Sequence, residues 1–165
     1  METLRLFLGY HYDATARQLK SARGVSELLH RPLDCAHGSL FGLLAHIVGV
    51  DRLWGLRIRE GLSLDHVPGA DDFADLDALE AALQEQQQAM TAFLLVISHT
   101  DLARTVSYRS TKGAKHTEPL GGLLLHMVNH GTHHRAEFAV LMRLLGHPLP
   151  DDDFLLALRE PDRTR

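Results

Sequence analysis

Four histidines lie close together in the segment LLLHMVNHGTHHRAE, residues 123–137, and their spacing favours metal coordination. His126, His130 and His134 are each four residues apart, and His133 precedes the last of them. In an α-helix, residues four apart lie on nearly the same face, about 6 Å apart along the axis, so two such imidazoles can bind one ion. His133 is rotated by roughly 100° from His134 and is not expected to share that ion.

A helical pair alone makes a weak site, so a third ligand is expected from another helix. His46 is the best candidate, because it lies in LLAHIVGV with apolar neighbours on both sides. A buried imidazole needs a polar or coordinating partner, and a metal ion would supply one. The alternative is that these histidines are ordinary core or boundary residues with polar partners. Spacing and composition leave both interpretations open.

The composition predicts a folded globular protein, and 165 residues fit a single domain over residues 1–165. The net charge of −4, without any basic run, argues against a nucleic-acid-binding surface. No apolar run approaches the roughly 20 residues of a membrane span, and no signal-peptide pattern opens the chain. Cys35 is the only cysteine, so no intrachain disulfide can form. A cytoplasmic location fits these features.

Helical periodicity dominates the chain and predicts four long helices. They are expected at residues 2–29, 39–60, 76–97 and 119–146. Ser39 suits an N-cap, and Gly61 follows the end of the second helix. Pro119 suits the start of the fourth helix, and Gly146 suits its C-cap.

Four long helices in one domain predict an all-α four-helix bundle. Long connections after the second and third helices predict a crossover connection. Residues 104–118, RTVSYRSTKGAKHTE, alternate around a central Lys-Gly and predict a small β-hairpin, and residues 151–160 predict a short terminal helix. The expected core includes Trp54, Leu79, Leu83, Met90, Phe93, Leu141 and Leu145.

Residues 123–155 resemble the C-terminal signature of the DinB/YfiT-like family, which includes mycothiol-dependent maleylpyruvate isomerases. That signature reads approximately Leu-x-His-x-x-Asn-His-x-x-x-His-Arg-Gly-Gln, followed by an apolar helix and a Gly-x-Pro turn before Asp-Phe. LLAHIVGVDRLW, residues 43–54, is similar to the family's second helix, and residues 105–126 are similar to its hairpin and the start of its last bundle helix. The resemblance spans nearly the whole chain.

Members of that family are four-helix bundles that bind a divalent metal ion through three histidines. The resemblance implies that these are His46, His130 and His134 in this chain. His126 matches a family histidine that is not generally a ligand, and it is expected to line the pocket or to hydrogen-bond near it. Trp54, which the resemblance also covers, is expected at the same pocket.

Three positions depart from the family's pattern. Ala136 and Glu137 stand where the family often has Gly and Gln. Glu137 either accepts a hydrogen bond beside the ligands or is a solvated charge, and the second is the simpler interpretation. Asp13 occupies the usual Trp position in YHYDATARQL, so a pocket lined by that position would be more polar here.

Three neutral imidazoles leave the charge of a metal ion uncompensated and its remaining positions open to water or substrate. Such an ion can acidify a bound thiol or water near pH 7. Relatives with assigned activities use low-molecular-weight thiols, so a metal-dependent thiol transferase is predicted ahead of a hydrolase by analogy. Zinc or nickel is the expected cofactor, and iron or manganese also suits the donors. A small-molecule substrate and a homodimer are expected.

Two other function classes stay open. The chain could be a non-catalytic metal- or small-ligand-binding bundle with an accessory role in stress responses, or a purely structural bundle whose histidines pair with polar groups. No general base is evident, because Asp51 lies about 140° around the helix from His46. Metal content and turnover with thiols would separate the three classes.

Overall fold

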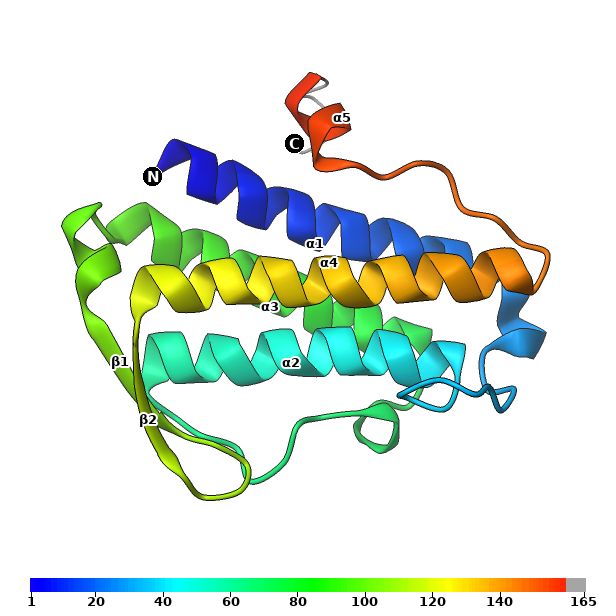
Figure 1. The fold of residues 1–165 in the computed structure, drawn as a ribbon, viewed down its shortest axis with the longest axis horizontal. Coiled ribbons are helices and arrows are strands. Elements are labelled where there is room, and N and C mark those ends of the chain that lie inside the picture. Colours follow the sequence, from blue (N-terminus) through cyan, green and yellow to red (C-terminus); the bar gives the residue numbers. More distant parts are fainter. Residues whose placement is uncertain (160–165) are drawn as a thin grey trace.

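The computed structural model describes residues 1–159 as a bundle of four long helices with a two-stranded hairpin at one end (Figure 1). The helices are α1 (Glu2–Ala22), α2 (Leu40–Glu60), α3 (Leu76–Val96) and α4 (Leu120–Leu144). The hairpin pairs β1 (Thr105–Arg109) with β2 (Lys115–Pro119), and a short helix, α5 (Phe154–Arg159), follows the bundle. The all-α bundle, the hairpin and the terminal helix that the sequence predicts are therefore confirmed.

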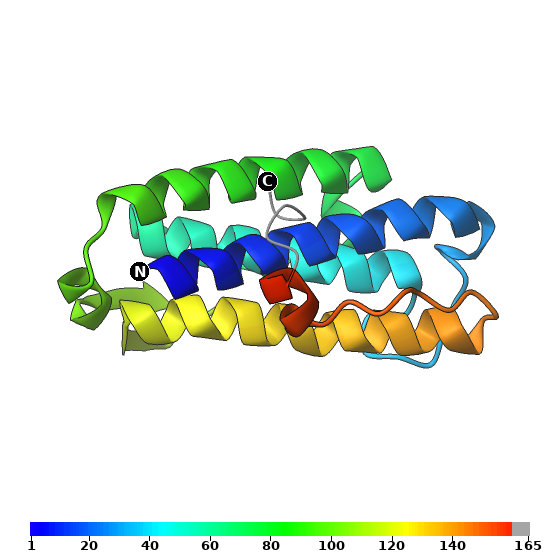
Figure 2. The ribbon, with the colours of Figure 1, turned by 90° about the horizontal axis from the view of Figure 1, so that it is seen from above.

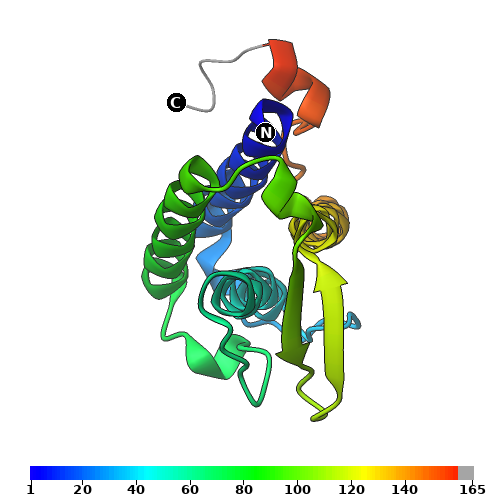
Figure 3. The ribbon, with the colours of Figure 1, turned by 90° about the vertical axis from the view of Figure 1, so that its left-hand side faces the viewer.

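The long connection between α2 and α3 is the crossover. Helices α1 and α4 run in one direction, and α2 and α3 run in the other (Figures 1 and 2). Residues 61–75 therefore travel back along the whole bundle before α3 begins. Viewed along the bundle, α1 and α2 each pack against both α3 and α4 (Figure 3). This arrangement places α2 directly beside α4, the two helices that carry the predicted ligands.

The ends of α2 and α4 follow the capping signals of the sequence. The Ser39 hydroxyl accepts a hydrogen bond from the Gly42 amide at 3.0 Å, and Gly61 ends α2 in the left-handed region with φ 68°. Gly146, with φ 89°, follows the end of α4 in the same way.

The first helix is shorter than the sequence predicts. Instead of running to residue 29, α1 ends at Ala22, and a 3-10 segment, Arg23–Leu28, continues from it. Inside that segment Val25 leaves helical geometry with φ −135° and is buried. An apolar residue every third position suits a 3-10 turn as well as an α-helix, and Gly24 lowers the helix propensity here.

The core lies along the contacts between the four helices. Leu79, Leu83 and Met90 of α3 are at most 1% exposed, and Trp54 of α2 is also buried, as predicted. Phe93, Leu141 and Leu145 are only partly buried and pack against the edge of the core. Within residues 1–159, no helix combines the length and the apolar character that crossing a membrane requires.

Candidate metal centre

Histidines from α2 and α4 meet in the space between these two helices. His46 of α2 faces His130 and His134 of α4, and its Nε2 lies 3.2 Å from Nε2 of His130. The ring centroids are 4.7 Å apart for His46 and His134, and 4.5 Å apart for His130 and His134. The three residues that the resemblance implies as ligands therefore gather at one place.

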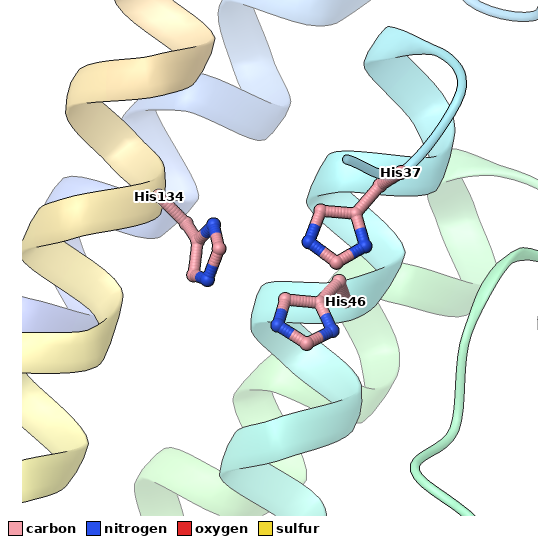
Figure 4. A group of neighbouring side chains, drawn as sticks. All are labelled: His37, His46 and His134. Carbon is pink, nitrogen blue, oxygen red and sulfur yellow. The ribbon is translucent and has the colours of Figure 1, made fainter. Parts of the chain in front are cut away.

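A fourth histidine, His37, lies against this cluster. Its ring stacks on the His46 ring at a centroid distance of 3.9 Å and meets the His134 ring edge-on at 5.2 Å. One ring nitrogen from each of His37, His46 and His134 lies within 4.8 Å of the other two (Figure 4). Spacing along the sequence does not reveal His37, because this residue lies in the turn before α2, where helical periodicity says nothing about the direction of a side chain.

Burial favours the neutral form of three of the clustered imidazoles, those of His37, His46 and His130. Burial, together with the nearby His37 and His134, lowers the pKa of His46 to about 4. Burial, together with the neighbouring histidines, lowers the pKa of His130 to about 3. The pKa of His37 is also lowered, chiefly by burial and then by His134. A neutral imidazole carries a lone pair that can bind a metal ion, whereas an imidazolium does not.

Glu137 orients His134. Its Oε2 lies 3.1 Å from Nδ1 of His134, and an ionised carboxylate can only accept, so Nδ1–H donates. The lone pair of His134 is then on Nε2, the nitrogen left for coordination. The interpretation of Glu137 as a merely solvated charge is wrong on this geometry, because the carboxylate is paired with a residue of the cluster.

Trp54 and His126 extend the cluster along the α2–α4 interface. The Trp54 ring lies edge-on to the His126 ring at 5.3 Å, and the His126 ring lies 5.9 Å from the His130 ring. On its other side Trp54 meets Tyr108 of β1 at 5.0 Å, and the guanidinium of Arg57 lies over both aromatic rings. These aromatic side chains lie beside the histidines, with His126 on the exposed side. The expected role of His126 and Trp54 at the pocket stays a prediction.

His133 lies on the exposed side of the cluster, with one ring nitrogen within 4.8 Å of donor atoms of His134 and Glu137, whereas Asp13 lies elsewhere. His133 is exposed, as its helical rotation predicts, although its ring remains 4.9 Å from that of His134. Asp13 of α1 accepts a hydrogen bond from Gln87 of α3 at 3.2 Å, on the side of the bundle where α1 meets α3. Burial raises the pKa of Asp13. A role of Asp13 at the histidine pocket therefore stays a prediction, and this hydrogen bond lends it no support.

A buried polar network supports the cluster from α1. His11 and Asp51 are both at most 1% exposed, and Nε2 of His11 lies 2.8 Å from Oδ2 of Asp51. The guanidinium of Arg135 donates to Nδ1 of His11 at 2.7 Å, so Nε2–H of His11 donates to Asp51. Asp51 is therefore engaged in the core, in agreement with its rotation away from His46. The His11–Asp51–Arg135 network joins three helices, and local sequence patterns did not reveal it.

The residues present fit a divalent metal ion. Two nitrogens that share a tetrahedral zinc ion lie about 3.3 Å apart, and Nε2 of His46 and Nε2 of His130 are 3.2 Å apart. Burial favours the neutral form of His46 and His130, and His134 has a carboxylate behind it, as metal-binding histidines commonly do.

Comparison with known proteins shows a match to one protein family. The model of the DinB family matches residues 27–163, which include α2, the hairpin and all four clustered histidines. No curated protein matches the chain.

Proposed function

The chain belongs to the DinB family, and on that basis we propose that it holds one divalent metal ion through His46, His130 and His134 to activate a small nucleophile. The observation that carries the proposal is the 3.2 Å approach of Nε2 of His46 and Nε2 of His130 across the α2–α4 interface. Two neutral nitrogens at this distance compete for at most one proton, whereas both lone pairs can serve one ion.

Each residue of the cluster has a definite part in this proposal. His46 and His130, whose pKa values burial lowers, supply neutral nitrogens, and Glu137 orients the ring of His134, the third ligand. Trp54 and Tyr108 form an aromatic pair beside the centre, and the His126 ring lies between Trp54 and His130. When bound, a divalent ion lowers the pKa of a coordinated thiol or water and so supplies a nucleophile near neutral pH.

The substrate class follows from the family resemblance. A low-molecular-weight thiol is the proposed cosubstrate and a thiol transferase the proposed activity, with hydrolysis by activated water as the other reaction of the same centre. Zinc or nickel is the proposed ion, and iron or manganese fits a nitrogen donor set with open positions.

The first experiment is metal analysis of untagged protein and of two matched variants. Wild type should hold about one ion per chain, and His46→Ala should lose most of it, because the His46 ring lies against those of His37, His130 and His134 and no other side chain replaces its nitrogen. His133→Ala removes an exposed imidazole of α4 and should keep the ion. Retention of the ion in both His46→Ala and His130→Ala would contradict the proposed site.

A thiol screen then separates a catalyst from a binding protein. Metal-loaded protein is incubated with small thiols and electrophilic acceptors, and consumption of thiol is compared with that of His46→Ala. The second candidate function is a non-catalytic metal-binding bundle, and His37 is the observation that favours it. A fourth imidazole would close the coordination sphere, as in structural rather than catalytic zinc sites. Metal binding without turnover would support this second candidate.

We also propose a homodimer. Large apolar side chains stay exposed on the outside of the bundle, among them Leu95, Val96, Leu125, Val140 and Leu144. Burying such side chains against a second copy would stabilise both chains. Sedimentation of a monomer at micromolar concentrations would contradict this expectation.

A further inference from the structure

His37 belongs to the histidine cluster by geometry but comes from a different kind of element. His46, His130 and His134 lie on long helices, whereas His37 lies in the turn that precedes α2. Figure 4 shows the His37 ring beside that of His46, on the opposite side of the cluster from His134. The His37 side chain lies near the imidazoles of His46 and His134 and is only half-buried. Part of it is therefore accessible to solvent.

The local sequence holds the backbone of His37 in this position. Leu33 and Gly38 are joined by a backbone hydrogen bond of 2.8 Å, and Gly38 has φ 71°, which favours glycine. A Cβ atom on Gly42 would lie only 2.1 Å from the carbonyl oxygen of His37. Because residue 42 is glycine, the turn that holds His37 can pack closely against the first turn of α2. This close contact directs His37 toward the cluster.

We propose that His37 is a fourth, exchangeable ligand that closes the metal centre in the resting protein and leaves when a thiolate binds. This inference rests on the proposed function, because it assumes an ion on His46, His130 and His134. It assigns this chain a four-imidazole resting state, one more histidine than the family resemblance implies.

The distances allow such closure with a small movement. One ring nitrogen from each of His37, His46 and His134 lies within 4.8 Å of the other two, and nitrogens on a tetrahedral zinc lie about 3.3 Å apart, so among these three no pair has to approach by more than about 1.5 Å. His130 joins them through its Nε2, 3.2 Å from Nε2 of His46. A side-chain rotation in a turn can provide this displacement. His37 is also the ligand that leaves most readily, because its release does not disturb a helix.

The exchange is balanced in atoms and charge. The bond between the ion and the His37 nitrogen breaks, the bond between the ion and the thiol sulfur forms, and the thiol proton goes to the solvent buffer. No oxidant or reductant takes part. A thiolate carries a full negative charge and imidazole carries none. A divalent ion therefore binds the thiolate more strongly than the His37 imidazole, which favours the exchange.

The first arm of the test counts imidazoles by zinc-edge X-ray absorption on the zinc-loaded full chain. Wild type should show four imidazoles, and His37→Ala should show three with one oxygen in place of the fourth. His133→Ala is the matched control, because His133 is also next to the cluster, and it should still show four. Three imidazoles in wild type, unchanged in His37→Ala, would overturn the proposal.

The second arm titrates 2-mercaptoethanol into the cobalt-loaded protein and follows the thiolate-to-cobalt absorption band. His37→Ala should bind the thiol about tenfold more tightly than wild type, since no internal ligand has to be displaced. Equal affinities would overturn the exchangeable role of His37. If neither protein retains metal, or if His46→Ala retains it fully, then the proposed metal site has failed. If only the His37 comparisons fail, that site stands.

Discussion

At the scale of single residues, the chemistry of the centre depends on which nitrogen each histidine presents. His134 presents Nε2, because Nδ1–H is engaged by Glu137 at 3.1 Å. Without that carboxylate, the His134 ring could adopt the other tautomer or rotate. Only part of the molecules would then present Nε2 to the ion, and the apparent metal affinity would fall.

Glu137→Ala should therefore lower metal affinity by about 10- to 100-fold while leaving the fold intact. Glu137→Gln should have a smaller effect, because an amide oxygen can still accept from Nδ1–H of His134. The measurement is a competition titration against a chromophoric chelator.

Glu85→Ala is the matched control for this experiment, because Glu85 is an exposed carboxylate on α3 and should leave affinity unchanged. If Glu137→Ala matches wild type, the hydrogen bond to His134 has no role in metal binding.

The ligand candidates could be read from the sequence only where spacing fixes direction. Spacing puts His126, His130 and His134 on one helical face, and His46 stands out as an imidazole in an apolar run. The choice of His130 and His134 over His126 came from the family resemblance. The positions of His37 and Glu137 could not be predicted, because both depend on tertiary structure. His37 lies in a turn, and the Glu137 side chain could equally have faced solvent.

At the scale of elements, Gly131 sets how closely α1 approaches α4. A Cβ on this residue would lie 2.2 Å from Cε1 of His11, far inside van der Waals contact. The His11 ring thus fills the space that a side chain at position 131 would need, directly beside His130. The buried network of His11, Asp51 and Arg135 depends on this close packing.

Gly131→Ala should destabilise the metal-free protein by about 1–3 kcal/mol, because the helices must separate or His11 must leave its partners. Equilibrium urea unfolding measures the change. Gly122→Ala is the matched control on the same helix: nothing lies within 4 Å of a Cβ there, so it should be neutral or stabilising by up to about 1 kcal/mol. Equal stabilities for the two variants would contradict the packing argument.

Helix ends that are set by local capping residues could be predicted from the sequence, whereas an end that is set by tertiary packing could not. The ends of α2 were predictable because Ser39 and Gly61 satisfy backbone groups locally. The end of α1 at Ala22 was not, because Val25 leaves the helix to reach the core, which is a tertiary effect. The network of His11, Asp51 and Arg135 was hidden for the same reason, since its members lie on three different helices.

At the scale of the whole molecule, gathering neutral imidazoles in the bundle makes folding sensitive to acid. The folded-state pKa values of His46 and His130 are about 4 and about 3, below the ordinary value of 6.5. Between about pH 6.5 and about pH 3, the unfolded chain therefore binds protons at these sites that the folded chain does not. Their contribution to stability is present above pH 6.5 and is lost as the pH falls through this window.

The metal-free protein should accordingly lose stability on acidification below about pH 6.5, by at most about 1.4 kcal/mol per pH unit for each such histidine. Carboxylates also contribute in acid, so the informative quantity is the difference between variants. His130→Gln removes one of the two groups and should flatten the pH dependence of the unfolding free energy between pH 6.5 and pH 4. His133→Gln, which changes an exposed side chain, should follow wild type. Urea unfolding at several pH values in the presence of a chelator measures these free energies. If the free energy of unfolding depends on pH in the same way for wild type and His130→Gln, then His130 is not held neutral in the folded bundle.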